Sequence, residues 1–272
     1  MIPLGTRQFT LNGRIGGGSF GVIWGGSSAD LQIAIKRVAV SDNFGRSVLE
    51  QEGRILEHIA SHGGCPYIPT YIGSYQDRTY LYMGLEFCSG GDLCDKIQKE
   101  GPLSEDLARR FLNQIAKALE KVHDLGITHG DVKPENLLLN GGQNSIKLAD
   151  FGSAKLDGLD LSGTEMACTQ TTAYCPPELF LGEKYASSCD VWSLGVIFFV
   201  MLFGKHPFDL TGRSSSGKIE ANIVSQDIEK ILRDPKIANK FHISEENTAL
   251  LRAMLSRNAQ ARPTAKEVVE WI

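Results

Sequence analysis

A short polar stretch of the chain carries side chains that could move a proton and bind charged groups. It is ITHGDVKPENLLL, which begins at Ile127 and has apolar residues at both ends. Its glycine, proline and charged residues exclude a buried strand and a regular amphipathic helix, so we expect an ordered loop between two core elements. In that loop Asp131 can accept a hydroxyl proton, Lys133 can neutralise phosphate charge, and Asn136 can bind a metal ion.

A glycine-rich stretch near the N-terminus has the spacing of a phosphate-binding loop. Gly16, Gly18 and Gly21 lie between two strand-like segments. Glycines let the backbone approach phosphate oxygens closely and leave its N–H groups accessible. A flexible hairpin turn is the alternative interpretation. A dinucleotide-binding fold is disfavoured because a strand-like segment starts at Val22, where that fold needs a helix.

A lysine and a glutamate occur within apolar patterns. Lys36 ends the strand-like IAIK, and lysine is rarely buried without an anionic partner, so we expect phosphates or a carboxylate beside it. Residues 47–60 have helical spacing, and Glu52 is the one acid of that segment within its apolar stripe. The alternative is a lysine that reaches solvent from an edge strand and a glutamate on a helix face that tolerates a polar side chain.

A further aspartate follows an apolar strand-like segment. Asp150 lies in IKLADFGSAK, directly before Phe151 and Gly152. Carboxylate and amide oxygens are the ligands that magnesium prefers, so Asp150 is a candidate metal ligand together with Asn136. Such a position alone is also compatible with an ordinary turn.

The composition excludes several classes of protein. The chain has 272 residues, is 42% hydrophobic and carries a formal net charge of −4, which gives no electrostatic reason to expect nucleic acid or anionic membrane as a partner. The six cysteines form no CxxC pair, so a zinc or thioredoxin-like site is unsupported and reduced thiols are expected. The N-terminus lacks a secretory signal, and the apolar stretch from Val191 is too short for a membrane span. We expect a cytoplasmic protein, with the nucleus as the alternative.

The elements that must position these residues change character along the chain. From Phe9 to about Glu86 the pattern is strand-like with one helical break, and it becomes mostly helical afterwards. One helix is expected to start at Ser104, as N-cap, and another near Val191. The stretch between Asp209 and Phe241 shows no usable motif, and its Ser-Gly run predicts a mobile surface loop.

Taken in order, these motifs resemble the eukaryotic-type protein kinases. The glycine-rich loop, IAIK, HGDVKPEN, DFG, PPE and DVWSLG occur in the order and spacing of that family, from Phe9 to about Ile272. The resemblance implies one kinase domain over residues 1–272, with an α+β, bilobal fold. Its β-rich N-lobe would cover about residues 1–86, its hinge about 86–91 and its helical C-lobe about 92–272.

The resemblance also implies a role for each matching residue. Lys36 would hold the α- and β-phosphates of ATP and pair with Glu52, and Asp131 would accept the proton of the substrate hydroxyl. Lys133 would contact the γ-phosphate and is the choice of serine/threonine kinases. Asn136 and Asp150 would hold Mg²⁺, with Mn²⁺ as an alternative. The other nucleotide-binding positions would be Gly16, Gly18, Gly21, Ile23, Ala34, Glu86, Cys88, Asp92 and Leu138.

The chain departs from the family at one position of the catalytic loop. Gly130 stands where most members carry an arginine that receives the phosphate of a phosphorylated activation segment. We therefore expect activity with little dependence on such phosphorylation. The hydroxyls of that segment are those of Ser162, Thr164, Thr169, Thr171 and Thr172. The alternative interpretation is that they are ordinary loop hydroxyls.

Three functional classes follow from these observations. The first is an active serine/threonine protein kinase, monomeric, with ATP and a protein acceptor as partners and neither nucleic acid nor membrane. The second is a pseudokinase that serves as a binding module, which would predict loss of Lys36, Asp131 or Asp150. The third is a kinase of small metabolites, whose members usually lack the PPE segment and the DVWSLG helix.

Overall fold

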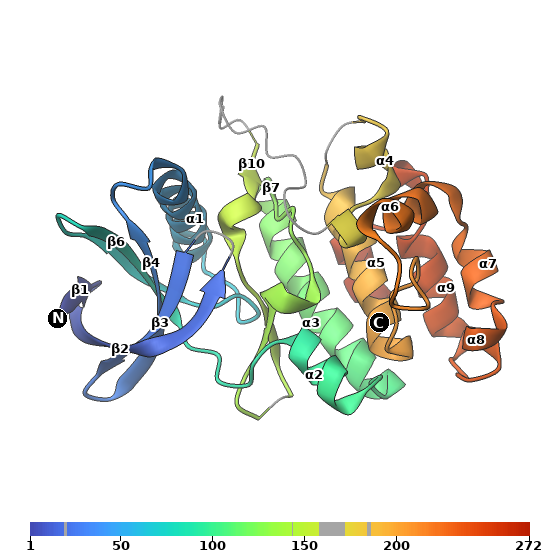
Figure 1. Cartoon of the computed structure of the whole chain (residues 1–272), viewed down its shortest axis with the longest axis horizontal. Coiled ribbons are helices and arrows are strands. Elements are labelled where there is room, and N and C mark those ends of the chain that lie inside the picture. The colour runs from blue at the N-terminus through green and yellow to red at the C-terminus, as the bar shows by residue number, and fades with distance from the viewer. Residues whose placement is uncertain (19–20, 143, 158–171, 184–185) are drawn as a thin grey trace.

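The chain folds into two lobes that lie side by side (Figure 1). The computed structural model describes residues 1–18, 21–142, 144–157, 172–183 and 186–272. One lobe contains a six-stranded sheet and a long helix, and the other consists mainly of helices. The expected bilobal α+β fold is therefore confirmed. None of the helices that the structure describes combines the length and apolarity needed to cross a bilayer.

The sheet of the N-terminal lobe is antiparallel, with strand order β1-β2-β3-β4-β6-β5. Burial alternates along β4 and shows which face of the sheet packs inward. Ile33 and Ile35 are fully buried, while Ala34 and Lys36 on the opposite face are only partly buried. The strands are β1 (Ile2–Leu4), β2 (Arg7–Gly18), β3 (Gly21–Ser28), β4 (Leu31–Ala39), β5 (Tyr71–Gln76) and β6 (Tyr80–Glu86).

Helix α1 (Asn43–Ser61) is the helical break in the strand pattern. Asp42 caps it by accepting the N–H of Gly45, which satisfies one of the free donors of the first turn. Its apolar stripe, including Ile55 and Ile59, is buried, and so is Glu52 within that stripe. The predicted helix and its inward-facing glutamate are thus confirmed.

The C-terminal lobe is built around α5, which is buried on nearly all sides. A short helix apolar all round is typical of the centre of a large core. The expected cap of α3 is present, since the Ser104 hydroxyl accepts the N–H of Leu107. The helices are α2 (Leu93–Glu100), α3 (Glu105–Asp124), α4 (Pro177–Phe180), α5 (Ser188–Phe203), α6 (Ser216–Ser225), α7 (Ile228–Leu232), α8 (Pro235–Ala238), α9 (Glu245–Met254) and α10 (Ala265–Trp271).

Two small strand pairs hold the polar loop in place at the junction of the lobes. Strand β7 (Ile127–Thr128) pairs with β10 (Lys155–Leu156) and ends just before the loop. Strand β8 (Leu137–Leu139) starts where the loop ends, and it pairs with β9 (Ile146–Leu148). The loop is therefore fixed at both ends by buried strands, as the sequence predicted.

The mobile surface loop predicted from the Ser-Gly run between Asp209 and Phe241 is confined at most to residues 211–215, which lie outside helices and are mostly exposed, and the rest of the stretch is largely helical. Helices α6, α7 and α8 lie there, and their Ile223, Ile231 and Ile237 are buried. The buried Asn222 side chain also donates to the backbone carbonyl of Phe208, which ties α6 to the segment after α5. These contacts outweigh the local preference of the Ser-Gly run. Strand β1 was also not predicted from the sequence.

Candidate active site

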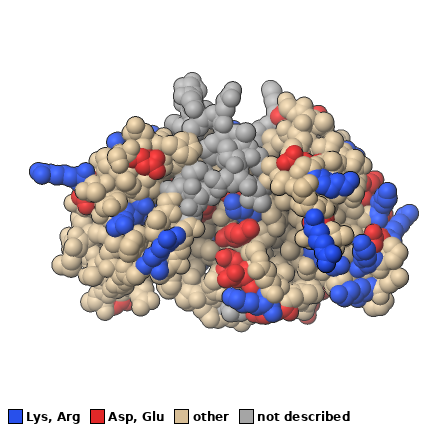
Figure 2. Space-filling view, viewed as in Figure 1, with Lys and Arg blue, Asp and Glu red and all other residues tan. Residues whose placement is uncertain are grey.

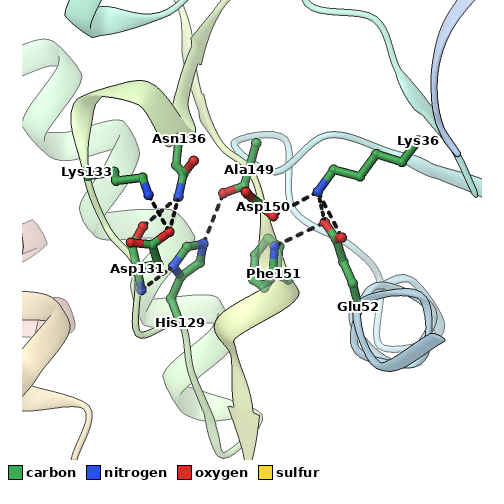
Figure 3. A network of polar contacts seen from close by, with 9 residues as sticks. All are labelled: Lys36, Glu52, His129, Asp131, Lys133, Asn136, Ala149, Asp150 and Phe151. Carbon is green, nitrogen blue, oxygen red and sulfur yellow. Dashed lines mark hydrogen bonds and ion pairs between the residues drawn. The ribbon is translucent and has the colours of Figure 1, made fainter. Parts of the chain in front are cut away.

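A lysine and two carboxylates from three elements meet between the lobes (Figure 3). Lys36 on β4 lies with its Nζ 2.7 Å from Oε1 and 2.9 Å from Oε2 of Glu52 on α1. The same Nζ is 2.8 Å from Oδ1 of Asp150, which follows β9. The sequence separations of 16 and 114 residues show that the fold, and not local structure, brings these groups together.

Burial and charge set the protonation of this group. Burial acts to lower the pKa of Lys36, but the carboxylates of Glu52 and Asp150 outweigh it, so the pKa lies above its usual value. Burial acts to raise the pKa of Asp150, and the attraction of Lys36 brings it below its ordinary range. The lysine is therefore a fixed cation and Asp150 a fixed anion at neutral pH.

Asp150 has an unusual backbone conformation. Its φ is 66°, and within the described part of the chain it is the one non-glycine residue with positive φ. This left-handed region is sparsely populated by residues with a Cβ, and it persists where surrounding contacts hold it. Here the N–H of Phe151 donates to Oε1 of Glu52 at 3.2 Å, and the Phe151 ring lies edge-on to His129 with centroids 4.8 Å apart.

The polar loop brings together the three residues that the sequence selected in it (Figure 3). Lys133 Nζ lies 2.7 Å from Oδ2 of Asp131, and Nδ2 of Asn136 donates to the same oxygen at 3.0 Å and to the Asp131 carbonyl at 2.8 Å. Since the amide nitrogen of Asn136 makes these bonds, its oxygen is the atom left for another ligand. In the space-filling view, acidic and basic side chains lie next to one another in the middle of the molecule (Figure 2).

The backbone of this loop is held by Asp190 of α5. Oδ2 of Asp190 accepts the N–H of His129 at 2.9 Å, and Oδ1 accepts the N–H of Gly130 at 2.9 Å. His123 of α3 also bonds to Oδ2 at 2.8 Å. Burial acts to raise the pKa of Asp190, but these donors and the nearby histidines bring it below its ordinary value. The buried anion thus has a full set of partners, as a buried charge requires.

The donor set suits a hard divalent cation. Within the described residues no three His, Cys, Asp or Glu side chains gather into a metal-binding cluster. A cation here would instead take the carboxylate of Asp150 and the amide oxygen of Asn136. Magnesium characteristically uses one or two protein oxygens and completes its shell with phosphates and water.

The other predicted nucleotide contacts lie on the elements around this group. Ile23 of β3 is paired with Lys36, and Ala34 is paired with Leu85 of β6. Gly16 pairs with Ile23, and Gly18 pairs with Gly21 across the β2–β3 turn. Residues 19–20 at the tip of that turn lie outside the described part of the chain.

Two further predicted positions have structural partners of their own. Asp92 caps α2 by accepting the N–H of Asp95 at 2.8 Å, and it pairs with Leu138 of β8 in an isolated bridge. Cys88 is partly buried, and burial together with the charge of Glu86 raises the pKa of its thiol to about 11. The thiol is therefore neutral at pH 7 and a poor nucleophile.

Sequence reasoning missed a lysine that connects β9 with the end of β6. Lys147 Nζ lies 2.8 Å from Oε2 of Glu86, which also accepts the N–H and hydroxyl of Thr70 at 3.1 Å and 3.0 Å. Lys147 is buried, and a lysine inside the apolar IKL pattern was a signal of the same kind as the one that selected Lys36.

Comparison with known proteins identifies the family. The protein kinase domain model matches residues 9–271. The 3-phosphoinositide-dependent protein kinase 1 of Arabidopsis thaliana is 37% identical over 81% of this chain and 42% of its own length. The putative ribosomal protein S6 kinase alpha-1 of Caenorhabditis elegans is 33% identical over 94% of this chain and 31% of its own length. Serine/threonine-protein kinase ATG1a of Arabidopsis thaliana is 32% identical over 96% of this chain and 40% of its own length.

The match covers the kinase portion of longer proteins, because the chain spans less than half the length of each of these three relatives. The family model begins within β2 and includes every later element that carries the site. The chain therefore belongs to the protein kinase family, and its relatives include named serine/threonine protein kinases.

Proposed function

We propose that this chain is a serine/threonine protein kinase that transfers the γ-phosphate of ATP to Ser or Thr hydroxyls of protein substrates. The observation that carries the proposal is the pair of groups described above. One group joins Lys36 to Glu52 and Asp150, the other joins Asp131 to Lys133 and Asn136, and both lie between the lobes (Figure 3). Phosphoryl transfer depends mainly on such positioning and on charge stabilisation.

Each side chain of the two groups has a distinct task in this proposal. Lys36 binds the α- and β-phosphates of ATP, and Glu52 keeps its Nζ in place. Asp131 orients the acceptor hydroxyl and receives its proton. Lys133, whose Nζ is 2.7 Å from that carboxylate, neutralises charge that develops on the transferred phosphoryl group.

We propose that Asp150 and Asn136 hold the divalent cation, which is Mg²⁺ with Mn²⁺ as an alternative. Both supply oxygen ligands, and Asn136 has its amide nitrogen occupied by Asp131, which leaves the oxygen for the metal. A divalent cation held by these two residues would supply positive charge that offsets the negative charge of the phosphates. Lys36 keeps Asp150 ionised and therefore ready to act as a ligand.

The nucleotide would lie between the sheet and β8. In this proposal Ala34 and Leu138 contact the two faces of the adenine, residues 86–88 contact its edge, and Asp92 meets the ribose. The two side chains that face the adenine are partly buried, which leaves them some surface for such a contact. The remaining contacts come from Gly16, Gly18, Gly21 and Ile23. The N-lobe would end near residue 86, the hinge would cover about 86–91, and the C-lobe would extend from about 92 to 272.

We also propose that activity depends little on phosphorylation of the activation segment. Gly130 replaces the arginine that receives the phosphate in most family members, and a glycine offers no side chain to bind it. Thr172 is the one of the five candidate hydroxyls within the described residues. We further propose a monomeric, cytoplasmic catalytic domain that acts on proteins and not on nucleic acid or membranes.

The two alternative functions have less support. A pseudokinase typically lacks the phosphate-binding lysine, the proton acceptor or the metal-binding aspartate, whereas Lys36, Asp131 and Asp150 are all present. A kinase of small metabolites usually lacks the PPE segment. Here Glu178 of that segment forms a buried, two-bond ion pair with Arg262 at 2.6 Å and 2.7 Å.

Phosphate transfer from labelled ATP with magnesium to dephosphorylated casein tests the proposal. The protein is first treated with phosphatase and is compared with Asp131→Asn, which keeps the shape of the side chain and removes its basicity. We expect transfer by the unmodified chain and a rate about 10²- to 10⁴-fold lower in the variant. Equal background rates in both, with nucleotide binding retained, would support the pseudokinase instead.

A further inference from the structure

The Thr172–Pro176 segment, which starts at the last of the activation-segment hydroxyls, lies close to the proposed catalytic aspartate. Gly130, Asp131 and Val132 of the polar loop share the lining of a small cavity with Tyr174, Cys175 and Pro176 of this segment. Burial is the largest cause of a raised pKa of Tyr174, and the negative charge of Glu135 in the catalytic loop adds to it. An acceptor chain that presents a hydroxyl to Asp131 must therefore pass close to this segment.

A histidine from a distant part of the chain bonds to the backbone of this segment. His206 follows α5, and its Nε2 lies 2.9 Å from the carbonyl oxygen of Ala173. The N–H of Phe208 points to Nδ1 of the same ring at 3.2 Å. Because Nδ1 accepts a hydrogen bond, the proton of the neutral ring is on Nε2, which donates to Ala173. The two backbone partners thus fix one tautomer and one ring orientation.

The residues behind His206 are buried and packed together. The Phe208 ring is stacked on Trp192 of α5 with centroids 5.6 Å apart and planes 6° apart. The buried Asn222 of α6 donates to the Phe208 carbonyl at 2.8 Å. The His206 ring also contacts the Tyr174 ring edge-on, with centroids 5.5 Å apart. His206 therefore connects the fixed α5–α6 framework to the segment beside Asp131.

A second side chain holds the same segment from α5. Ser193 Oγ lies 2.8 Å from the carbonyl of Tyr174 and 3.1 Å from that of Cys189. A hydroxyl has one hydrogen to donate, so it can satisfy only one of these carbonyls at a time. Of these two side-chain contacts, the His206 bond to Ala173 is consequently the more defined.

We propose that His206 is a positioning residue for the acceptor protein, which acts by holding the Thr172–Pro176 segment at a fixed distance from Asp131. The inference rests on the proposed kinase function and names a residue that the phosphate-transfer chemistry itself does not use. His206 contacts neither the Lys36 group nor the polar loop through any hydrogen bond in the described residues. Its loss should consequently affect the acceptor and spare the nucleotide.

Two substitutions separate the hydrogen bond from simple packing. His206→Gln keeps an N–H donor near the position of Nε2, and His206→Leu fills similar space without a donor. One neutral hydrogen bond corresponds to about a three- to tenfold change in an equilibrium constant. We expect His206→Leu to raise KM for dephosphorylated casein by about that factor with KM for ATP unchanged, and His206→Gln to restore most of the loss. A control is His62→Leu, which removes a histidine–carbonyl contact of 2.8 Å at the C-terminal end of α1.

Amide hydrogen exchange provides a readout that needs no acceptor protein. The N–H of Cys175 donates to the Thr172 carbonyl at 3.1 Å, so it reports the order of this segment directly. We expect faster exchange at Cys175 in His206→Leu and near-normal exchange in His206→Gln. Unchanged exchange in His206→Leu, or an equal rise of KM for casein and ATP, would overturn the proposal. Background transfer by the wild-type chain would instead count against the kinase function and leave the exchange test to decide on His206.

Discussion

Gly130 donates its backbone N–H to Oδ1 of Asp190 at 2.9 Å from a left-handed conformation, with φ of 79°. The glycine was selected in the sequence because it lacks the arginine side chain of most family members. The structure adds a second reason, because glycine adopts positive φ without the steric cost that a Cβ brings. The conformation also directs the N–H toward the buried carboxylate that holds the loop. Gly130 thus serves the loop backbone as well as removing a phosphate anchor.

Replacement of Gly130 by alanine should reduce stability through its backbone alone. A left-handed conformation costs a residue with a Cβ about 1–2 kcal/mol, so the free energy of unfolding should fall by about that amount. Urea denaturation followed by fluorescence measures it, with the slope of the transition unchanged. Gly13→Ala is the control, because a Cβ at Gly13 meets nothing within 4 Å and its φ is not positive. A Gly130→Ala protein as stable as wild type would show that the loop can relax away from Asp190.

Replacement of Arg262 by methionine should be much more damaging. Its side chain is fully buried and bonds to both oxygens of Glu178, so the variant leaves a buried carboxylate without its partner. Breaking such a pair typically costs about 3–5 kcal/mol. The double variant Arg262→Met with Glu178→Leu should recover part of the loss in the same urea titration. No recovery in the double variant would mean that the contact of Arg262 with the Trp192 ring, 4.9 Å away, and its packing matter more than the charge pair.

Single alanine substitutions at the activation-segment hydroxyls should leave most of the activity intact. The positions are Ser162, Thr164, Thr169, Thr171 and Thr172, all but the last outside the described residues. We expect losses of less than about tenfold, below 1.36 kcal/mol in barrier, since Gly130 cannot bind a phosphate placed on any of them. Thr171 is the exception to interpret separately, because it matches the family's threonine near the acceptor. A large loss at one other site, reversed by phosphorylating the wild-type chain there, would contradict the expectation.

Sequence alone predicted the features that depend on regular spacing or on the order of motifs. The period of α1 placed Glu52 on its buried face, and Ser104 was recognised as a helix cap. Helices α7 and α8 have five and four residues, too short to show a period, so their buried isoleucines went unnoticed. Three-residue strand β1 is missed for the same reason.

Long-range partners are the other feature that sequence patterns do not contain. Lys147 and Glu86 are 61 residues apart, and His206 and Ala173 are 33 apart, with no spacing rule that connects them. The φ of Gly130 was likewise hidden, because the motif comparison draws attention to the missing side chain and not to the backbone. The candidate catalytic residues and Glu52 were found because each stands in a motif or a periodic pattern, whereas supporting contacts such as those of Lys147 and His206 were found only in three dimensions.

Lowering the pH should destabilise the protein, because the folded structure holds the His206 ring in its neutral form. Burial lowers the pKa of the ring to about 4 from the ordinary 6.5, against smaller opposing effects of the Ala173 carbonyl and of Asp209, the charged group that faces it. Between these values the unfolded chain binds a proton that the folded chain does not, so the free energy of unfolding falls as the pH decreases from 6.5 to 4. At 1.36 kcal/mol per pKa unit, the loss from this one group is at most about 3 kcal/mol.

Comparison with His206→Gln isolates this contribution, because other groups titrate in both proteins. Urea denaturation at pH 7.5, 6, 5 and 4.5 should give a stability difference between the two proteins that shifts in favour of the glutamine variant as the pH falls. Most of that shift should occur below pH 6.5, where the unfolded histidine becomes charged. A difference that stays constant over this range would mean that the folded ring accepts a proton as easily as the unfolded one. In that case the Nε2–H bond to Ala173 would persist in the charged ring, and the contact with the Phe208 N–H would be the one that is lost.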